Sequence, residues 1–299
     1  MKCRTFVLGG LILFLALLFY GPFESFKLLW VNTAMYSSNF KWLAKLVYSD
    51  NYITTILEQN DISKLEKMDI SRINILNNNS LYFAEVKGNY YKGFIIKIEN
   101  PARLNLVCSN NNYGKLLEEL VWENGALGGI NASAYSDDTM RGIVWGTTII
   151  NGKITNMGKK DVLHTIAGIN QDYKLVIGYF TNEEILYQDY LWAVEFGPIL
   201  IINGEKTILS AYSGGIAPRT AIGQMKDGSV LLVVIDGRQI DSYGATFQDI
   251  QEIMFANGVI NAICLDGGSS STIMYNGKVQ NKPSGDKNER LLPNAIIFK

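Results

Sequence analysis

One segment near the end of the chain constrains the fold more than any other, because strand, helix and strand patterns follow each other closely. Residues 229–236 read Ser-Val-Leu-Leu-Val-Val-Ile-Asp, an apolar run rich in β-branched side chains that is typical of a buried strand. Residues 246–257 show apolar side chains near helical spacing, and Gly258 stands at the expected C′ position. Residues 259–265 form a second apolar run. This order predicts a crossover unit with two parallel neighbouring strands.

Charged residues stand at the ends of these predicted strands, beside glycine and hydroxyl residues. Asp236 ends the first strand and Asp266 follows the second, while Arg219 and Arg238 flank the first strand in sequence. Because open α/β sheets bind ligands at the carboxyl ends of their strands, we expect these side chains to converge on one site. The alternative is that each Asp-Gly pair is only a turn.

Asparagine–glycine pairs predict hairpin turns in other parts of the chain. They occur at residues 151–152, 203–204 and 276–277, and Asn-Gly is the preferred central pair of type I′ hairpins. Frequent hairpins argue against a purely doubly wound sheet. We therefore expect an α+β fold, with a single catalytic domain of mixed β-sheets and packed helices over residues 81–299.

The N-terminal segment is the most apolar part of the chain. Lys2 and Arg4 precede an uncharged run from Phe6 to Tyr20 that extends to Phe23. The run is long for a signal-peptide core, no small-x-small cleavage site follows it, and the two cations favour a cytoplasmic N-terminus. We interpret residues 1–23 as a cytoplasmic tip and an uncleaved single-pass transmembrane anchor, with the catalytic domain outside the cytoplasm. Secretion after cleavage of a signal peptide is the alternative.

Residues 24–80 form a region of their own between the predicted anchor and the predicted catalytic domain. Their apolar residues follow a broken helical periodicity, which predicts a helical stalk or linker. Such a helix lies along the membrane or packs on the catalytic domain, and the sequence leaves both arrangements open.

Charge and histidine content exclude several classes of function. The formal net charge is -1, so nothing draws the chain to nucleic acid. His164 is the single histidine, which excludes two-histidine zinc hydrolysis, and no Gly-x-Ser-x-Gly elbow accompanies it. We interpret His164 as solvent-exposed or structural. Cys108 and Cys264 lie in strand-like surroundings where free thiols are common, although a disulfide between them is an alternative. We predict no metal and no cofactor, so carboxylates and arginines must carry the chemistry.

An ordered set of short motifs runs through the C-terminal half of the chain. Its members are Gly128-Gly129-Ile130-Asn131-Ala132, Gly152-Lys153-Ile154, Phe196-Gly197-Pro198-Ile199-Leu200, Pro218-Arg219-Thr220-Ala221-Ile222-Gly223, Asp236-Gly237-Arg238, Gly244-Ala245-Thr246, Leu265-Asp266-Gly267-Gly268-Ser269-Ser270-Ser271-Thr272 and Glu289-Arg290. The set resembles the phosphodiester glycosidase family, and an ordered set is more specific than any single motif.

The resemblance implies a hydrolase that cleaves the sugar C1–O bond of a sugar-1-phosphodiester to free sugar and phosphomonoester. Suitable substrates include an N-acetylglucosamine-1-phosphodiester and a cell-surface glycopolymer such as an exopolysaccharide.

The bond to be broken assigns roles to the residues in these motifs. Phosphate is a good leaving group whose charge must be stabilised, and a planar guanidinium binds two of its oxygens at once. Attack at C1 needs a carboxylate, either as nucleophile or as the base for water. We predict three catalytic residues, Asp266 as the first carboxylate, Asp236 as the second, and Arg219, with Glu195 in reserve. The predicted substrate- and phosphate-binding residues are Arg238, Asn131, Thr220, Gly267, Gly268, Ser269, Ser270 and Arg290.

Two other functions stay open at this level. One is a non-catalytic, membrane-anchored module that binds a glycan or wall polymer in the same pocket. The other is a phosphodiesterase that cuts the phosphorus–oxygen bond. The second is less attractive because cleavage at phosphorus commonly relies on bound metals, and the sequence shows no cluster of metal ligands.

Overall fold

The computed structural model divides the chain into two compact units. It describes residues 2–35, 41–58, 67–76, 78–135, 142–207, 209, 214–284 and 289–299. The first unit comprises residues 1–64 and 208–215, and the second comprises residues 65–207 and 216–299.

The first unit is helical where it is described. Its helices are α1 (Lys2–Tyr20), α2 (Glu24–Met35), α3 (Lys41–Val47) and α4 (Asp50–Glu58). Val31 of α2, Ala44 of α3 and Ile53 of α4 are buried together in one small core. The hydroxyl of Tyr48 donates a hydrogen bond of 2.8 Å to the carbonyl of Phe19. The apolar residues of this region therefore pack on each other in a short helical bundle.

The transmembrane helix predicted within residues 1–23 is wrong. A spanning helix needs about 20 consecutive apolar residues, whereas α1 has 19 residues that include Lys2 and Arg4. The helix ends at Tyr20, where Gly21 and Pro22 follow and disfavour its continuation. Among the described residues, no helix is both long enough and apolar enough to cross a bilayer.

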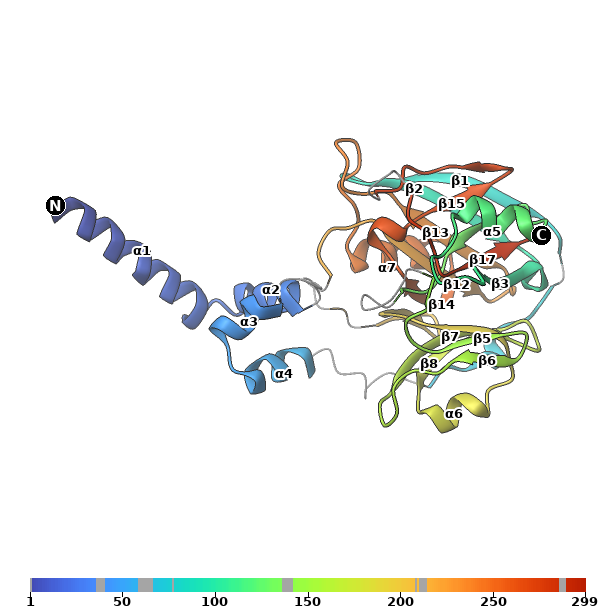
Figure 1. The fold of residues 1–299 in the computed structure, drawn as a ribbon, viewed down its shortest axis with the longest axis horizontal. Coiled ribbons are helices and arrows are strands. Elements are labelled where there is room, and N and C mark those ends of the chain that lie inside the picture. The colour runs from blue at the N-terminus through green and yellow to red at the C-terminus, as the bar shows by residue number, and fades with distance from the viewer. Residues whose placement is uncertain are drawn as a thin grey trace. The chain divides into compact units, whose positions relative to one another are not determined.

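The second unit is built on three β-sheets. The first has the order β1 (Leu81–Lys87), β2 (Lys92–Ile98), β13 (Val230–Ile235), β12 (Arg219–Met225), β14 (Val259–Leu265), β10 (Ile199–Ile202) and β11 (Glu205–Lys206). The second has the order β16 (Lys278–Val279), β15 (Ile273–Tyr275), β4 (Gly128–Asn131), β17 (Asn294–Phe298) and β3 (Leu104–Cys108). The third has the order β6 (Lys153–Asn156), β5 (Thr148–Ile150), β9 (Tyr190–Glu195), β7 (His164–Asn170) and β8 (Leu175–Phe180). Figure 1 shows the three sheets.

One hydrophobic core joins the three sheets. It contains buried side chains from each of them, such as Leu232 of the first sheet, Ile130 of the second and Val194 of the third. Among the described residues of this unit, three short α-helices accompany the sheets: α5 (Leu117–Glu123), α6 (Asn182–Leu186) and α7 (Phe247–Ala256). Sheets with few helices fit the predicted α+β class.

The crossover predicted for residues 228–266 is present, but its two strands are not neighbours. Strand β12 lies between β13 and β14 and pairs antiparallel with both, so Arg219 is opposite Ile235 and Thr220 is opposite Leu265. The prediction of parallel neighbours is therefore wrong, because an antiparallel strand from earlier in the chain separates them. Since β13 and β14 still run in one direction, both end at the edge where β12 begins.

Helix α7 has the boundaries that its sequence signals predict. Thr246 is the N-cap and accepts a hydrogen bond from the backbone N–H of Asp249, whose carboxylate accepts one from the N–H of Thr246. This reciprocal pair is a capping box. Gly258, with φ of 78°, follows the helix in the left-handed region that glycine adopts without strain.

The Asn-Gly pairs form the tight turns that the sequence predicts. Asn151 and Gly152 have φ of 50° and 73°, and Asn203 and Gly204 have φ of 54° and 86°. Positive φ at both central residues is the condition for a type I′ turn. The first pair joins β5 to β6 and the second joins β10 to β11.

Residues 67–76 belong to the second unit and are tied to Asn203. The side-chain amide oxygen of Asn203 accepts a hydrogen bond of 2.8 Å from the N–H of Asp69, and its Nδ2 donates one of 3.1 Å to the carbonyl of Lys67. The backbone carbonyl of Asn203 accepts a bond of 2.7 Å from Arg72. This segment is therefore part of the folded second unit.

Candidate functional site

A buried polar network lies where β4, β12 and the segment after β14 meet. We call Asn131, Thr220, Ser271 and Thr272 the strand-end network; each is at most 1% exposed. Asn131 Oδ1 accepts hydrogen bonds from Thr220 Oγ1 at 2.8 Å and from the N–H of Thr272 at 3.1 Å, and its Nδ2 donates to the carbonyl of Asp266. Thr220 Oγ1 also lies 3.2 Å from Ser271 Oγ. The network fixes the backbone of the turn that starts at Asp266.

That turn depends on glycine at two positions. Gly268 has φ of 61° and begins the 3-10 helix Gly268–Ser270. A Cβ on Gly267 would lie 2.9 Å from the carbonyl oxygen of Pro218, and that oxygen accepts a hydrogen bond of 2.9 Å from the N–H of Gly268. The absence of side chains therefore lets the turn approach the start of β12 closely.

Arg238 lies against the same turn. Its Nη2 is 3.3 Å from the position that a Cβ on Gly268 would occupy. Arg238 has φ of 59° and a solvent-exposed side chain. The structure therefore brings the second predicted arginine to the predicted glycine turn.

Arg219 is held in place on the other side of the β12 start. It is 8% exposed, its Nε donates a hydrogen bond of 3.0 Å to the carbonyl of Ala245, and its guanidinium lies 3.9 Å from the ring centre of Phe247. Burial lowers the pKa of Arg219, and the charge of Arg238 lowers it further. An arginine remains charged despite such a shift, so this edge holds a buried positive charge.

Asp236 is buried and positions a neighbouring segment. It is 2% exposed, and its Oδ1 accepts hydrogen bonds of 3.0 Å from Asn281 Nδ2 and of 3.0 Å from the N–H of Lys282. Burial raises the pKa of the Asp236 carboxyl, although these two hydrogen bonds oppose the shift. The second predicted carboxylate thus anchors the chain around Asn281.

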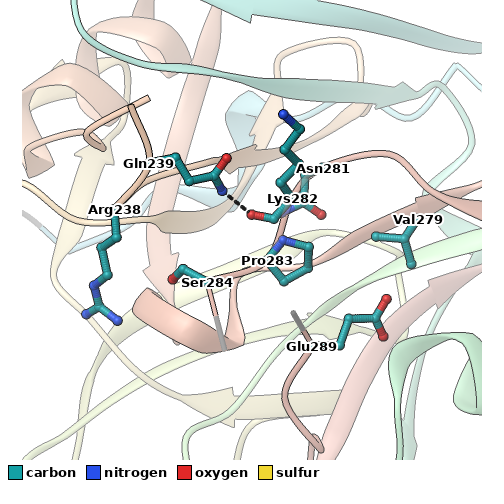
Figure 2. Close-up of a pocket in the computed structure, with 8 residues that line it drawn as sticks. All are labelled: Arg238, Gln239, Val279, Asn281, Lys282, Pro283, Ser284 and Glu289. Atoms are coloured by element: carbon teal, nitrogen blue, oxygen red, sulfur yellow. Dashed lines mark hydrogen bonds between the residues drawn. The ribbon is translucent and has the colours of Figure 1, made fainter. Parts of the chain in front are cut away.

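The anchored segment forms one wall of an open cavity of about 660 Å³. The residues that line it come from three parts of the chain: Arg238, Gln239, Val279, Asn281, Lys282, Pro283, Ser284 and Glu289. Figure 2 shows these side chains, with Gln239 donating a hydrogen bond to the carbonyl of Lys282. Arg238 is the lining residue that the sequence predicts as a site residue. The others were missed, although Glu289 stands in one of the motifs.

Two polar atoms of the lining residues have no hydrogen-bond partner in the described part of the chain. They are Oγ of Ser284 and Oε2 of Glu289, and both atoms are buried. Burial raises the pKa of Glu289, and the charge of Glu118 in α5 raises it further. Buried polar atoms usually have a partner, so these two are exceptions among the residues that line the cavity.

Arg290, the third predicted arginine, is bound to the far end of the glycine turn. Its Nη1 donates a hydrogen bond of 2.8 Å to Ser269 Oγ, and its guanidinium lies 4.1 Å from the ring centre of Tyr135. Burial lowers the pKa of Arg290. Ser270, the next residue of the turn, is buried. Arg290 therefore holds the turn through Ser269.

Glu195, the reserve carboxylate, is paired with the single histidine. Its Oε1 lies 2.9 Å from His164 Nδ1, and its Oε2 accepts a hydrogen bond of 2.7 Å from the N–H of Thr147. His164 is 1% exposed, so the solvent-exposed interpretation is wrong. Burial lowers the pKa of His164, but Glu195, Asn182 and the carbonyl of Lys159 together outweigh it, and the net pKa is raised. Both oxygens of Glu195 are thus used in internal contacts.

The disulfide considered for Cys108 and Cys264 does not form. Both thiols are free, and they lie in different sheets, on β3 and β14. Burial raises the pKa of Cys108 to about 11 and that of Cys264 to about 12. Neither thiol is activated as a nucleophile, because the thiolate is the reactive form.

Comparison with known proteins covers the part of the chain that holds this site. Residues 124–299 match a family model described as phosphodiester glycosidase. The human N-acetylglucosamine-1-phosphodiester alpha-N-acetylglucosaminidase is 32% identical over 135 residues, which cover 39% of this chain and 26% of that protein. An SPbeta prophage-derived uncharacterized protein YomE of Bacillus subtilis is 43% identical over 81 residues, covering 27% of this chain and 12% of that protein.

A solved structure shows the same fold. It is the zebrafish N-acetylglucosamine-1-phosphodiester alpha-N-acetylglucosaminidase catalytic domain, auto-inhibited by its pro-peptide. The TM-score is 0.64 at 21% identity, with 76% of this chain and 86% of that chain covered. The chain matches a smaller share of the curated relatives. The matched region is 26% of the length of the human protein.

Proposed function

Since the chain belongs to the phosphodiester glycosidase family, we propose that it hydrolyses the C1–O bond of a sugar-1-phosphodiester. The products are a free sugar and a phosphomonoester. The observation that carries the proposal is the position of Arg238, which lines the cavity and lies against the Gly268 turn. A cavity that is lined by a guanidinium and a carboxyl, with the guanidinium against a glycine turn, suits a phosphorylated sugar.

Arg238 and the glycine turn bind the phosphate group in this proposal. A guanidinium holds two phosphate oxygens at once, and backbone N–H groups of a tight turn form a nest for anions. The strand-end network of Asn131, Thr220, Ser271 and Thr272 holds the turn in place, through the hydrogen bond that Asn131 Nδ2 donates to the carbonyl of Asp266. Asn131 then acts on the backbone of the turn and Arg238 on the substrate.

Asp266 is the carboxylate that we place nearest C1. It directly follows β14 at the first position of the turn and is partly exposed. Asp236 suits this role less well, because it is 2% exposed and its Oδ1 binds Asn281 and Lys282. A carboxylate near C1 stabilises the positive charge of the oxocarbenium-like transition state.

The substrate class follows from the relatives' names. The human and zebrafish proteins are named for N-acetylglucosamine-1-phosphodiester, and we propose that linkage, in a small molecule or a cell-surface glycopolymer, as the bond that this chain cleaves. Action outside the cytoplasm stays a prediction.

Two variants test the proposal. Asp266→Asn and Arg219→Ala should each abolish sugar release from methyl N-acetylglucosamine-1-phosphate while far-UV circular dichroism stays unchanged. Arg219 supplies positive charge at the start of β12. Its loss removes electrostatic stabilisation of the leaving phosphate. Full activity in both purified variants would overturn the assignment.

Hydrolysis in ¹⁸O-labelled water identifies the bond that breaks. Attack at C1 places the label in the sugar, whereas a phosphodiesterase that cuts the P–O bond would place it in the phosphate. Binding of the substrate without any turnover would instead support a non-catalytic glycan-binding module.

A further inference from the structure

We propose that Glu289 is the general base that activates the water molecule which attacks C1. This inference rests on the proposed function and assigns one step of it to a residue outside the predicted catalytic set.

The cavity places Glu289 with the phosphate-binding arginine. Among the residues that line it, Glu289 is the one with a carboxyl group, and Arg238 is also one of them. In Figure 2, Arg238 and Glu289 lie at opposite sides of the group formed by Ser284 and Pro283. In this proposal, a phosphodiester held by Arg238 extends its sugar across the cavity toward Glu289.

The carboxyl group of Glu289 also differs from the other carboxylates in its hydrogen bonding. Its Oε2 has no hydrogen-bond partner among the described residues. By contrast, Asp236 Oδ1 accepts two hydrogen bonds from its own wall segment, and Glu195 uses one oxygen for His164 and the other for Thr147. These two carboxylates hold the fold together, whereas no such bond to a described residue fixes Glu289 Oε2.

The charges around Glu289 favour proton uptake. Burial raises its pKa, and Glu118, which faces it from α5, raises the pKa further. The cations that line the same cavity are Arg238 and Lys282, and Arg290 is the next residue in the chain. A carboxylate with a raised pKa takes a proton from water more readily, provided that it is ionised at the working pH.

In the proposed step, water attacks C1 as the phosphate leaves. The oxygen of a water molecule forms a bond to C1 while one of its protons moves to the carboxylate of Glu289. The bond between C1 and the phosphate oxygen breaks, and its electron pair leaves with the phosphomonoester, whose charge Arg238 stabilises. Glu289 then releases its proton to solvent. Asp266 is left to stabilise the positive charge at C1.

Glu289→Gln in the chain of residues 1–299 is the primary test, with methyl N-acetylglucosamine-1-phosphate as substrate. Glutamine keeps the shape and a hydrogen-bond acceptor but cannot take the proton. We expect kcat to fall by about 10²- to 10⁴-fold, the range for loss of general base catalysis. KM should change little. The wild-type kcat/KM should rise with pH through the pKa of Glu289, because the base must be ionised, and this rising limb should be absent from the variant.

Glu118→Gln gives a second, independent readout. Glu118 raises the pKa of Glu289 from α5, so its neutralisation should move the rising limb to lower pH with little change in the maximal kcat. Glu119→Gln is the matched control, because Glu119 is the next residue of α5 and its carboxylate is bound to the N–H of Leu116. It should leave the limb where it is.

The outcomes separate this inference from the proposed function. A wild-type protein that releases no sugar overturns both. A wild-type protein that is active, with a Glu289→Gln variant that keeps its kcat or its rising limb, overturns the role of Glu289 alone. A variant that loses thermal stability but keeps the limb shows a purely structural glutamate, which also overturns it.

Discussion

The strand-end network and the cavity are both polar, but they differ in how their polar atoms are satisfied. In the network, Asn131 Oδ1 accepts two hydrogen bonds and its Nδ2 donates a third. In the cavity, Oγ of Ser284 and Oε2 of Glu289 have no partner among the described residues. The two regions are joined, because Asn281 of the cavity wall donates to the carbonyl of Ser271 in the network.

Clustering of polar residues alone therefore does not identify a site of chemistry. Internally satisfied polar atoms stabilise one backbone conformation, whereas unsatisfied ones have capacity left for a ligand. The network should therefore govern stability and the cavity should govern activity. Four substitutions test this division, beginning with the one for which we expect the largest effect.

Arg238→Ala should lower kcat/KM for methyl N-acetylglucosamine-1-phosphate by about 10²- to 10³-fold, as expected for loss of a charged donor to the leaving group. The free energy of unfolding should change little, since the side chain is exposed. Lys282→Ala is the matched control. Lys282 also lines the cavity, but its Nζ forms an ion pair with Asp241 Oδ2 at 3.6 Å. Equal losses in both variants would contradict a specific role for Arg238.

Asn131→Ala should act on stability. It removes the acceptor for Thr220 and for the N–H of Thr272 and leaves both buried, so the free energy of unfolding should fall by about 2–4 kcal/mol. Urea denaturation measures it. Asn105→Ala, on an exposed position of β3, is the control and should change stability by less than about 0.5 kcal/mol. A stable but inactive Asn131→Ala variant would break the division between the two regions.

Gly268→Ala should affect both properties modestly. At φ of 61° an alanine costs about 1–2 kcal/mol. Its Cβ would also lie 3.3 Å from Arg238 Nη2 and displace the guanidinium, so kcat/KM should fall by about 10-fold. Gly258→Ala separates the two effects, because it has φ of 78° and no atom within 4 Å of its added Cβ. That control should lose stability alone. Equal loss of activity in both variants would show that the contact with Arg238 is irrelevant.

Asp236→Asn should give the smallest effect, a change in the pH dependence of stability. Burial raises the pKa of Asp236 in the folded state, so the folded protein binds this proton more tightly than the unfolded chain does. Wild-type stability should then fall as pH rises from the ordinary aspartate pKa through the raised one. Asparagine cannot titrate, so this fall should be absent from urea titrations of the variant between about pH 4 and pH 7. A wild-type protein that gains stability across that window would contradict the shift.

Local patterns predict the elements of this region well but not their pairing. The apolar runs correspond to β13 and β14, and the helical spacing between them corresponds to α7. The apolar runs and the helical spacing each depend on residues that are close in sequence, so the sequence alone predicts them. The placement of β12 between the two strands depends on contacts with residues that lie between 6 and 45 positions away, and no local periodicity records them.

The candidate site divides in the same way. The glycine turn and Arg238 are recognisable from short motifs, and the structure brings them together. The wall at Asn281 is not recognisable, because its link to Asp236 joins residues 45 positions apart. Glu289 stands in a motif, but only its burial and its unpartnered oxygen distinguish it from an ordinary surface glutamate.

The attachment of residues 67–76 to the second unit sets a practical limit on shortening this chain. Asn203 is 7% exposed and binds Lys67, Asp69 and Arg72 through its side chain and carbonyl. A chain that starts at residue 81 would leave these polar groups without their partners and would uncover the apolar surface under Met68, which packs against the main core. Expression of the catalytic unit alone should therefore begin near residue 65, where the second unit starts.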